Sequence, residues 1–187
     1  MAGHALVVGG TGMLAGAVRG LALDGWRVSV LARGAESFVK DPGAPVDGFD
    51  CDYQNLAAFD AALRAAEAAN GRIGLAVAWF HTLKIEAPRR LAEAVGAPGE
   101  AGLYVQVLGS GVADPARPDR LRIAADVSRG LPDCRLSQVI LGFEIEGGAA
   151  RWLTHAEIST GVLRAIRDGA PLSVIGRTEP WAARPTG

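Results

Sequence analysis

Short, continuous apolar runs alternate along the chain with longer stretches in which apolar residues recur every three or four positions. The runs have the length of strands that are buried on both faces, and the longer stretches have the spacing of amphipathic helices. The clearest run covers residues 73–80, and the clearest helical pattern places Leu56, Phe59, Leu63 and Ala66 on one face. This alternation of strands and helices predicts an α/β protein with one Rossmann-type, doubly wound parallel sheet.

The same patterns give the boundaries of the expected elements. Strands are expected at residues 5–8, 26–33, 46–49, 73–80, 102–109, 134–141 and 172–175. Helices are expected at residues 12–24, 35–40, 56–70, 87–95 and 154–168, with a charged helix between 118 and 129 and a break at 41–45. Residues 142–148 are expected to form a loop that borders a substrate, and 178–187 a proline-containing tail with an isolated Trp181.

The last helix carries the strongest start signal in the chain. Thr154 and Glu157 have the spacing of a capping box, in which each side chain bonds a backbone N–H of the other residue. His155 then belongs to the first turn of this helix, and we expect no catalysis from it.

A glycine-rich turn connects the first strand to the first helix. The spacing Gly10-x-Gly12-x-x-Ala15 fits the Rossmann fingerprint: one small residue permits the turn, the next lets a ligand approach the backbone, and the third lets the helix pack on the strand. The start of the helix presents unpaired N–H groups that suit a pyrophosphate. The turn therefore predicts a dinucleotide site, and a glycine-rich turn without a ligand is the alternative.

The ends of strands two and three indicate which dinucleotide is bound. Arg33 lies where an acidic residue would hold the ribose hydroxyls of NAD, and a basic residue there accommodates the additional phosphate of NADP. The alternative is an exposed, solubilising arginine. Asp52 follows strand three and is placed to accept a bond from the adenine amino group; alternatively, Asp52 or Asn55 caps the next helix.

Candidates for proton chemistry follow strands four and five. His81 and Lys84 come directly after the apolar run and overhang the expected cofactor site. Ser110 ends strand five, where its hydroxyl would face the nicotinamide half of the crevice. The alternatives are solvated charges for His81 and Lys84, and an ordinary turn residue for Ser110.

Composition limits the remaining function classes. The chain has 187 residues, 49% of them hydrophobic, and a formal net charge of −1, which favours one domain over residues 1–187 and disfavours a nucleic-acid partner. No apolar run is long enough to cross a membrane, and the N-terminus lacks the basic region of a secretory signal. Cys51 and Cys134 have neither metal-ligand nor disulfide spacing. We expect a cytoplasmic protein with a small-molecule substrate, without metal, membrane or nucleic-acid partners.

The Gly9-Gly10-Thr11-Gly12 turn, Arg33, Asp52 and the serine that ends strand five together resemble the short-chain dehydrogenase/reductase superfamily. The chain is most similar to an atypical branch of small bacterial proteins of unassigned substrate, which share the opening at 7–14 and the stretches at 78–81 and 151–155. This resemblance implies the strand order 3-2-1-4-5-6-7 and an NADP cofactor across the carboxyl edge of the sheet. It also implies a homodimer, although the short helix before residue 129 weakens that analogy.

The resemblance also implies roles for individual residues. The residues that it places around NADP are Gly9, Gly10, Thr11, Gly12, Met13 and Leu14 in the pyrophosphate loop, Arg33 at the 2′-phosphate, Asp52 and Tyr53 at the adenine, and Trp79 at the ribose side of strand four. Ser110 takes the place of the superfamily's catalytic serine.

Departures from the superfamily pattern bear on catalysis. The superfamily uses a tyrosine and a lysine four residues later, whereas this chain has only Tyr53 and Tyr104, with alanine at 57 and leucine at 108. Trp79-Phe80-His81 replaces the usual Asn-Ala-Gly, and its bulk would narrow the nicotinamide pocket. The third glycine is also shifted, to Gly16.

Two functional hypotheses follow. The first is an atypical NADP(H)-dependent oxidoreductase that lacks the Tyr-x-x-x-Lys pair, with Ser110 as hydrogen-bond donor and His81 or Lys84 as proton source. The second is a non-catalytic NADP(H)-binding sensor or regulatory protein. Polar groups aimed into a pocket at 79–84 favour the first hypothesis, and a Trp–Phe plug there favours the second.

Overall fold

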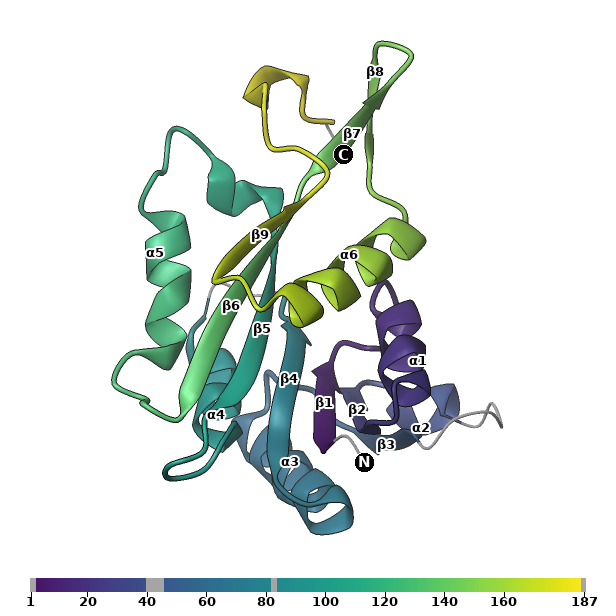
Figure 1. Cartoon of the computed structure of the whole chain (residues 1–187), viewed down its shortest axis with the longest axis vertical. Coiled ribbons are helices and arrows are strands. Elements are labelled where there is room, and N and C mark those ends of the chain that lie inside the picture. Colours follow the sequence, from purple (N-terminus) through teal and green to yellow (C-terminus); the bar gives the residue numbers. More distant parts are fainter. Residues whose placement is uncertain (1–2, 40–45, 82–83, 186–187) are drawn as a thin grey trace.

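A seven-stranded parallel sheet forms the centre of the molecule in a computed structural model that describes residues 3–39, 46–81 and 84–185 (Figure 1). Its strand order is β3-β2-β1-β4-β5-β6-β9, which confirms the predicted order because the seventh predicted strand is β9. The strands of this sheet are β1 (His4–Val8), β2 (Arg27–Ala32), β3 (Val46–Asp50), β4 (Ile73–Trp79), β5 (Gly102–Gly109), β6 (Cys134–Leu141) and β9 (Leu172–Ile175).

Helices cover both faces of this sheet. The helices are α1 (Ala15–Leu23), α2 (Ala35–Phe38), α3 (Leu56–Asn70), α4 (Glu86–Ala94), α5 (Arg120–Ala125) and α6 (His155–Asp168). One core cluster joins α1 and α6 to the sheet, and a second joins α3 and α4 to its other face. The strands alternate between the two clusters: Val7 faces α1, whereas Leu6 and Val8 face α3. All three are almost fully buried, as expected of strands between two helical layers.

Most predicted boundaries agree with the structure. The strands at 102–109, 134–141 and 172–175 and the helix at 56–70 are confirmed. The first helix begins at Ala15 and not at residue 12, because residues 9–14 form the turn. The predicted helix at 35–40 is α2, which ends at Phe38; Lys40 and the predicted break at 41–45 lie outside the described residues. The charged helix is α5, followed by a short 3₁₀ segment, Asp126–Ser128.

The predicted loop at 142–148 is wrong. Phe143–Glu146 (β7) and Ala149–Trp152 (β8) form an antiparallel hairpin outside the main sheet, with Glu146 opposite Ala149 (Figure 1). Its two-residue turn is Gly147-Gly148, with φ of +58° and +84°. Two central residues with positive φ are what a tight hairpin turn requires, so the sequence signal was present and was missed.

Helix caps agree with their sequence signals. The capping box of α6 is complete, with Thr154 and Glu157 each bonding the other's backbone N–H. Asn55 caps α3, its Oδ1 accepting from the N–H of Ala58 at 3.1 Å. Asn55, and not Asp52, therefore caps α3. No helix among the described residues is long and apolar enough to span a membrane.

A buried polar cluster joins β1, β2 and α3 at the edge of the sheet opposite the carboxyl ends. His4 is 2% exposed; its Nδ1 lies 2.6 Å from the carbonyl oxygen of Gly71, and its Nε2 lies 2.9 Å from Oγ of Ser29. The amide of Asn70 donates to Ser29 at 3.1 Å and to Asp47 at 2.7 Å. The carbonyl can only accept, so the neutral ring carries its proton on Nδ1 and accepts from Ser29 at Nε2.

Stability is expected to fall in acid through His4. Burial lowers the pKa of His4 from its ordinary value of 6.5, so the unfolded chain binds a proton at higher pH than the folded chain does. The free energy of unfolding then declines as the pH falls through 6.5 and levels off below the folded pKa. Melting curves from pH 8 to 5 should show this decline, and a His4→Gln variant should show a shallower one. His155→Gln, at an exposed site, is the control variant, and equal slopes for wild type and His4→Gln would contradict the assignment.

Candidate functional site

The glycine turn between β1 and α1 is built from residues with different tasks. Gly9 has φ of +76°, and a Cβ there would lie 3.0 Å from the carbonyl oxygen of Trp79. Gly10 is buried beneath the turn, where a Cβ would press on three valine side chains of β1, α1 and β2 at 3.0–3.2 Å. Gly12 differs, because a Cβ there would meet nothing within 4 Å. Packing therefore explains the first two glycines and leaves the third open to a ligand.

The start of α1 is suited to an anion. No side chain caps this helix, and its first turn holds no acidic residue. The first N–H groups of an α-helix have no partner within the helix, and they carry a partial positive charge. By contrast, side chains cap both α3 and α6.

α6 holds the glycine turn in place. Oγ of Ser159 donates to the carbonyl oxygen of Met13 at 2.9 Å. Gly16 gives α6 room, because a Cβ on Gly16 would lie 2.8 Å from the side chain of Ser159. The shifted third glycine of the fingerprint is thus explained by contact between α1 and α6.

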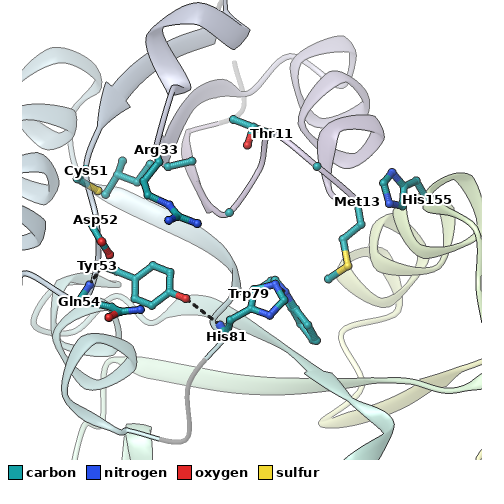
Figure 2. Close-up of a pocket in the computed structure, with 14 residues that line it drawn as sticks. Thr11, Met13, Arg33, Cys51, Asp52, Tyr53, Gln54, Trp79, His81 and His155 are labelled. Atoms are coloured by element: carbon teal, nitrogen blue, oxygen red, sulfur yellow. Dashed lines mark hydrogen bonds between the residues drawn. The ribbon is translucent and has the colours of Figure 1, made fainter. Parts of the chain in front are cut away.

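A pocket of about 460 Å³ opens at the carboxyl ends of β1, β2, β3 and β4 (Figure 2). Eight of the predicted cofactor residues line it: Gly9, Thr11, Gly12, Met13, Arg33, Asp52, Tyr53 and Trp79. The other two, Gly10 and Leu14, are buried beneath the turn, with Leu14 in the core between α1 and the sheet. Residues that were not predicted also line the pocket: Leu31, Ala32, Cys51, Gln54 and His155.

The side chains after β2 and β3 face each other across one end of this pocket. Arg33 directly follows β2 and points into the space that the pocket encloses (Figure 2). Asp52 follows β3, and its Oδ1 accepts from the N–H of Gln54 at 2.9 Å. Asp52 contributes the pocket's only carboxylate among the described residues. Cys51 is buried, and burial raises the pKa of its thiol to about 11, so the thiol stays protonated at neutral pH.

His81 is held between an indole and a phenol. Nε1 of Trp79 donates to Nε2 of His81 at 2.6 Å, and the backbone N–H of His81 donates to the hydroxyl of Tyr53 at 3.0 Å (Figure 2). The indole N–H can only donate, so Nε2 of His81 is an acceptor and the neutral ring carries its proton on Nδ1.

The three residues predicted for proton chemistry line different pockets. His81 lines the pocket just described, whereas Lys84 lines a mostly apolar pocket of about 520 Å³ bounded by α4, α5 and the end of β5. Ser110 lines a third pocket, of about 250 Å³. The indole of Trp79 borders all three pockets. Neither His81 nor Lys84 shares a pocket with Ser110 among the described residues.

No family model and no curated protein matches this sequence. Solved structures match it over most of its length. A short-chain dehydrogenase/reductase from Serratia marcescens is 16% identical, with a TM-score of 0.69 over 93% of this chain and 96% of the other. A variant of actinorhodin polyketide ketoreductase, solved with NADPH, is 15% identical, with a TM-score of 0.69 over 92% and 95%. The reductase/Diels–Alderase MalC from Malbranchea aurantiaca is 14% identical, with a TM-score of 0.63 over 93% and 95%.

The chain has the short-chain dehydrogenase/reductase fold. At these identities the likeness concerns the fold, and the chemistry must be argued from the residues present.

Tyr104 lies within the short-chain dehydrogenase/reductase fold but away from its pockets. Its side chain is fully buried in β5, and its hydroxyl has no hydrogen-bond partner among the described residues. Burial raises the pKa of this phenol well above its ordinary value. Tyr104 is therefore not placed to exchange a proton with a ligand in the three pockets described above. Tyr53 lines the first pocket, and the residue four positions later is alanine.

Arg184, which no sequence pattern indicated, lies beside Ser110. Its Nε donates to Oγ of Ser110 at 2.8 Å, although 74 residues separate the two. The guanidinium carbon lies 4.9 Å from the ring centre of Trp152 on β8 and 5.3 Å from that of Trp181. Trp181 begins a 3₁₀ segment, Trp181–Ala183, and is not isolated as predicted. The chain thus returns, after β9, to the carboxyl end of β5.

Proposed function

We propose that this protein is an NADP(H)-dependent oxidoreductase of the short-chain dehydrogenase/reductase type that acts on a small molecule. The observation that carries the proposal is the space over Gly12. A Cβ there would meet no atom of the described protein within 4 Å, and Gly12 does not have positive φ, so neither the turn nor contact at the Cβ position explains a glycine. A ligand that passes close to the backbone does explain it.

The neighbouring residues fit the remaining parts of such a ligand. The uncapped start of α1 suits the pyrophosphate, and the guanidinium of Arg33 suits the 2′-phosphate of NADP. Asp52, which does not cap α3, keeps an oxygen for the adenine amino group. Actinorhodin polyketide ketoreductase, which shares the fold, was solved with NADPH, and this supports the choice of a nicotinamide cofactor.

In the proposed reaction, individual residues of this chain would have the following roles. NADPH, when bound, supplies a hydride. Trp79 separates the cofactor pocket from the two pockets beyond it and so limits how far a ring can advance. His81 offers the proton on Nδ1, because Trp79 occupies Nε2. Ser110 offers a hydroxyl from the third pocket, and Lys84 an ammonium group from the mostly apolar one.

A non-catalytic NADP(H)-binding protein is the second candidate. The separation of His81, Lys84 and Ser110 into different pockets favours it, as does the burial of Tyr104. NADPH oxidation against a panel of aldehydes, ketones and quinones distinguishes the two candidates. Turnover with any of them supports the enzyme, whereas tight NADPH binding without turnover supports the binding protein.

Titration of the protein with NADPH and NADH tests the cofactor assignment. We expect NADPH to bind in the micromolar range and Arg33→Ala to weaken NADPH about tenfold to a hundredfold, because a charge-assisted pair contributes about 1.5–3 kcal/mol. NADH binding should change little. Arg27→Ala is the matched control, since Arg27 lies at the opposite end of the same strand. Equal losses for both nucleotides, or for both variants, would contradict the role of Arg33 at the 2′-phosphate.

A further inference from the structure

The third pocket holds the guanidinium group of Arg184 beside two indole rings. Its central carbon lies 4.9 Å from the ring centre of Trp152 and 5.3 Å from that of Trp181. Cation–π contacts of this kind attract the guanidinium to the ring faces. Nε of Arg184 is bonded to Ser110. Because the guanidinium is planar, Nη2 lies on the same edge as that bond, next to the hydroxyl of Ser110.

The hydrogen-bonding capacity of this pair is only partly used. Among residues 3–39, 46–81 and 84–185, nothing accepts a hydrogen bond from Nη1 or Nη2 of Arg184, and no carboxylate pairs with it. Oγ of Ser110 accepts from Arg184, which leaves its own proton to donate, and no described residue accepts that proton. Arg151 provides a contrast, because Glu146 and Glu157 occupy its guanidinium. The Ser110–Arg184 pair thus offers the two NH₂ groups of Arg184 and the O–H group of Ser110, none of which has an acceptor in the described part of the chain.

The rest of the pocket limits what can accept these donors. Leu141, Leu153 and Ile158 form an apolar wall, and Ser110 itself is only 4% exposed. The volume of about 250 Å³ suits a compact molecule. A carboxylate oxygen matches Nη2 of Arg184, and a carbonyl oxygen on the adjacent carbon matches the hydroxyl of Ser110 beside it.

We propose that Ser110 and Arg184 form a substrate subsite for a small carbonyl compound that carries a neighbouring carboxylate, as in a 2-oxo acid. Arg184 binds the carboxylate through Nη2, the terminal nitrogen on the same edge of the guanidinium as Nε, and Ser110, which is bonded to Nε, donates its proton to the carbonyl oxygen on the adjacent carbon. The positive charge beside Ser110 strengthens that donor. The assignment of the ligand as a substrate rests on the proposed oxidoreductase function, but the anion site itself is defined by the residues of the third pocket.

Oxamate tests the subsite, because it places a carboxylate next to an amide carbonyl that a hydride donor does not readily reduce. Calorimetric titrations of oxamate, with and without saturating NADPH, would be read together with the fluorescence of the tryptophans near Arg184. We expect Arg184→Gln to weaken oxamate about tenfold or more and Ser110→Ala to weaken it less. Methyl oxamate, which lacks the charge, should bind poorly to the wild type. Arg167→Gln, an exposed site in the last turn of α6, is the matched control.

The outcomes separate this subsite from the proposed function. If NADPH binds but oxamate does not, or if Arg184→Gln behaves like Arg167→Gln, the subsite is overturned and the cofactor assignment stands. If oxamate binds through Arg184 while NADPH does not bind, the subsite stands and the proposed oxidoreductase fails. If Arg184→Gln does not fold, Arg184→Lys decides: a clear loss of oxamate affinity supports recognition by the guanidinium, and unchanged affinity overturns it.

Discussion

Substituting valine for Gly12 is expected to weaken NADPH binding by roughly 30-fold or more, about 2 kcal/mol, without lowering the melting temperature appreciably. The two effects are expected to separate because a Cβ at this position meets no protein atom within 4 Å and extends into the space over the turn. A pyrophosphate on the N–H groups of α1 needs that space. Valine would hold the phosphates away from the groups that bind them.

Thermal unfolding and NADPH titration of the same preparation give the melting temperature and the NADPH affinity of Gly12→Val. Gly74→Val is the matched control, because a Cβ on Gly74 approaches only the carbonyl oxygen of His4, at 3.9 Å, far from the pocket. The control should retain the wild-type affinity for NADPH. Unchanged affinity in Gly12→Val would mean that the dinucleotide does not cross the turn at this residue, and the central observation behind the proposed function would lose its explanation.

Local patterns were enough to predict the sheet and most of the cofactor pocket. A strand buried on both faces is mostly apolar, so β4 is visible as a continuous run. The glycine turn follows the first predicted strand, Arg33 ends the second, and Asp52 lies just beyond the third; the carboxyl ends of parallel strands meet at one edge of a sheet. Topology therefore brings these residues together without any knowledge of their side-chain contacts.

Contacts between distant segments were beyond the reach of the same patterns. Arg184 lies in a short, irregular segment, and nothing in its neighbourhood indicates Ser110 as its partner. In the sequence, Gly16 is a displaced residue of the glycine fingerprint. In the structure, a Cβ on Gly16 would collide with Ser159 of α6, which the sequence pattern could not indicate. The position of Trp79 between three pockets likewise depends on β5, on α4 and α5, and on the C-terminal segment together.

Gly9→Ala is expected to destabilise the protein by about 2–4 kcal/mol. An alanine at φ of +76° has a strained backbone that costs about 1–2 kcal/mol, and its Cβ would lie 3.0 Å from the carbonyl oxygen of Trp79. This oxygen belongs to the backbone of β4, so it cannot move aside as the end of a flexible side chain can. For a chain of this size the melting temperature should fall by roughly 5–15 °C.

The Gly25→Ala variant measures the cost of backbone strain at positive φ without a steric clash. Gly25 has φ of +86°, but a Cβ there would meet nothing within 4 Å, so this variant should lose only the backbone part. The difference between the two variants measures how firmly the end of β4 resists displacement. Because Trp79 borders all three pockets, a Gly9→Ala protein that still folds should also show altered tryptophan fluorescence and weaker NADPH binding. Equal stabilities for the two variants would mean that β4 yields at Trp79, and Trp79 could not then act as a fixed wall between cofactor and substrate.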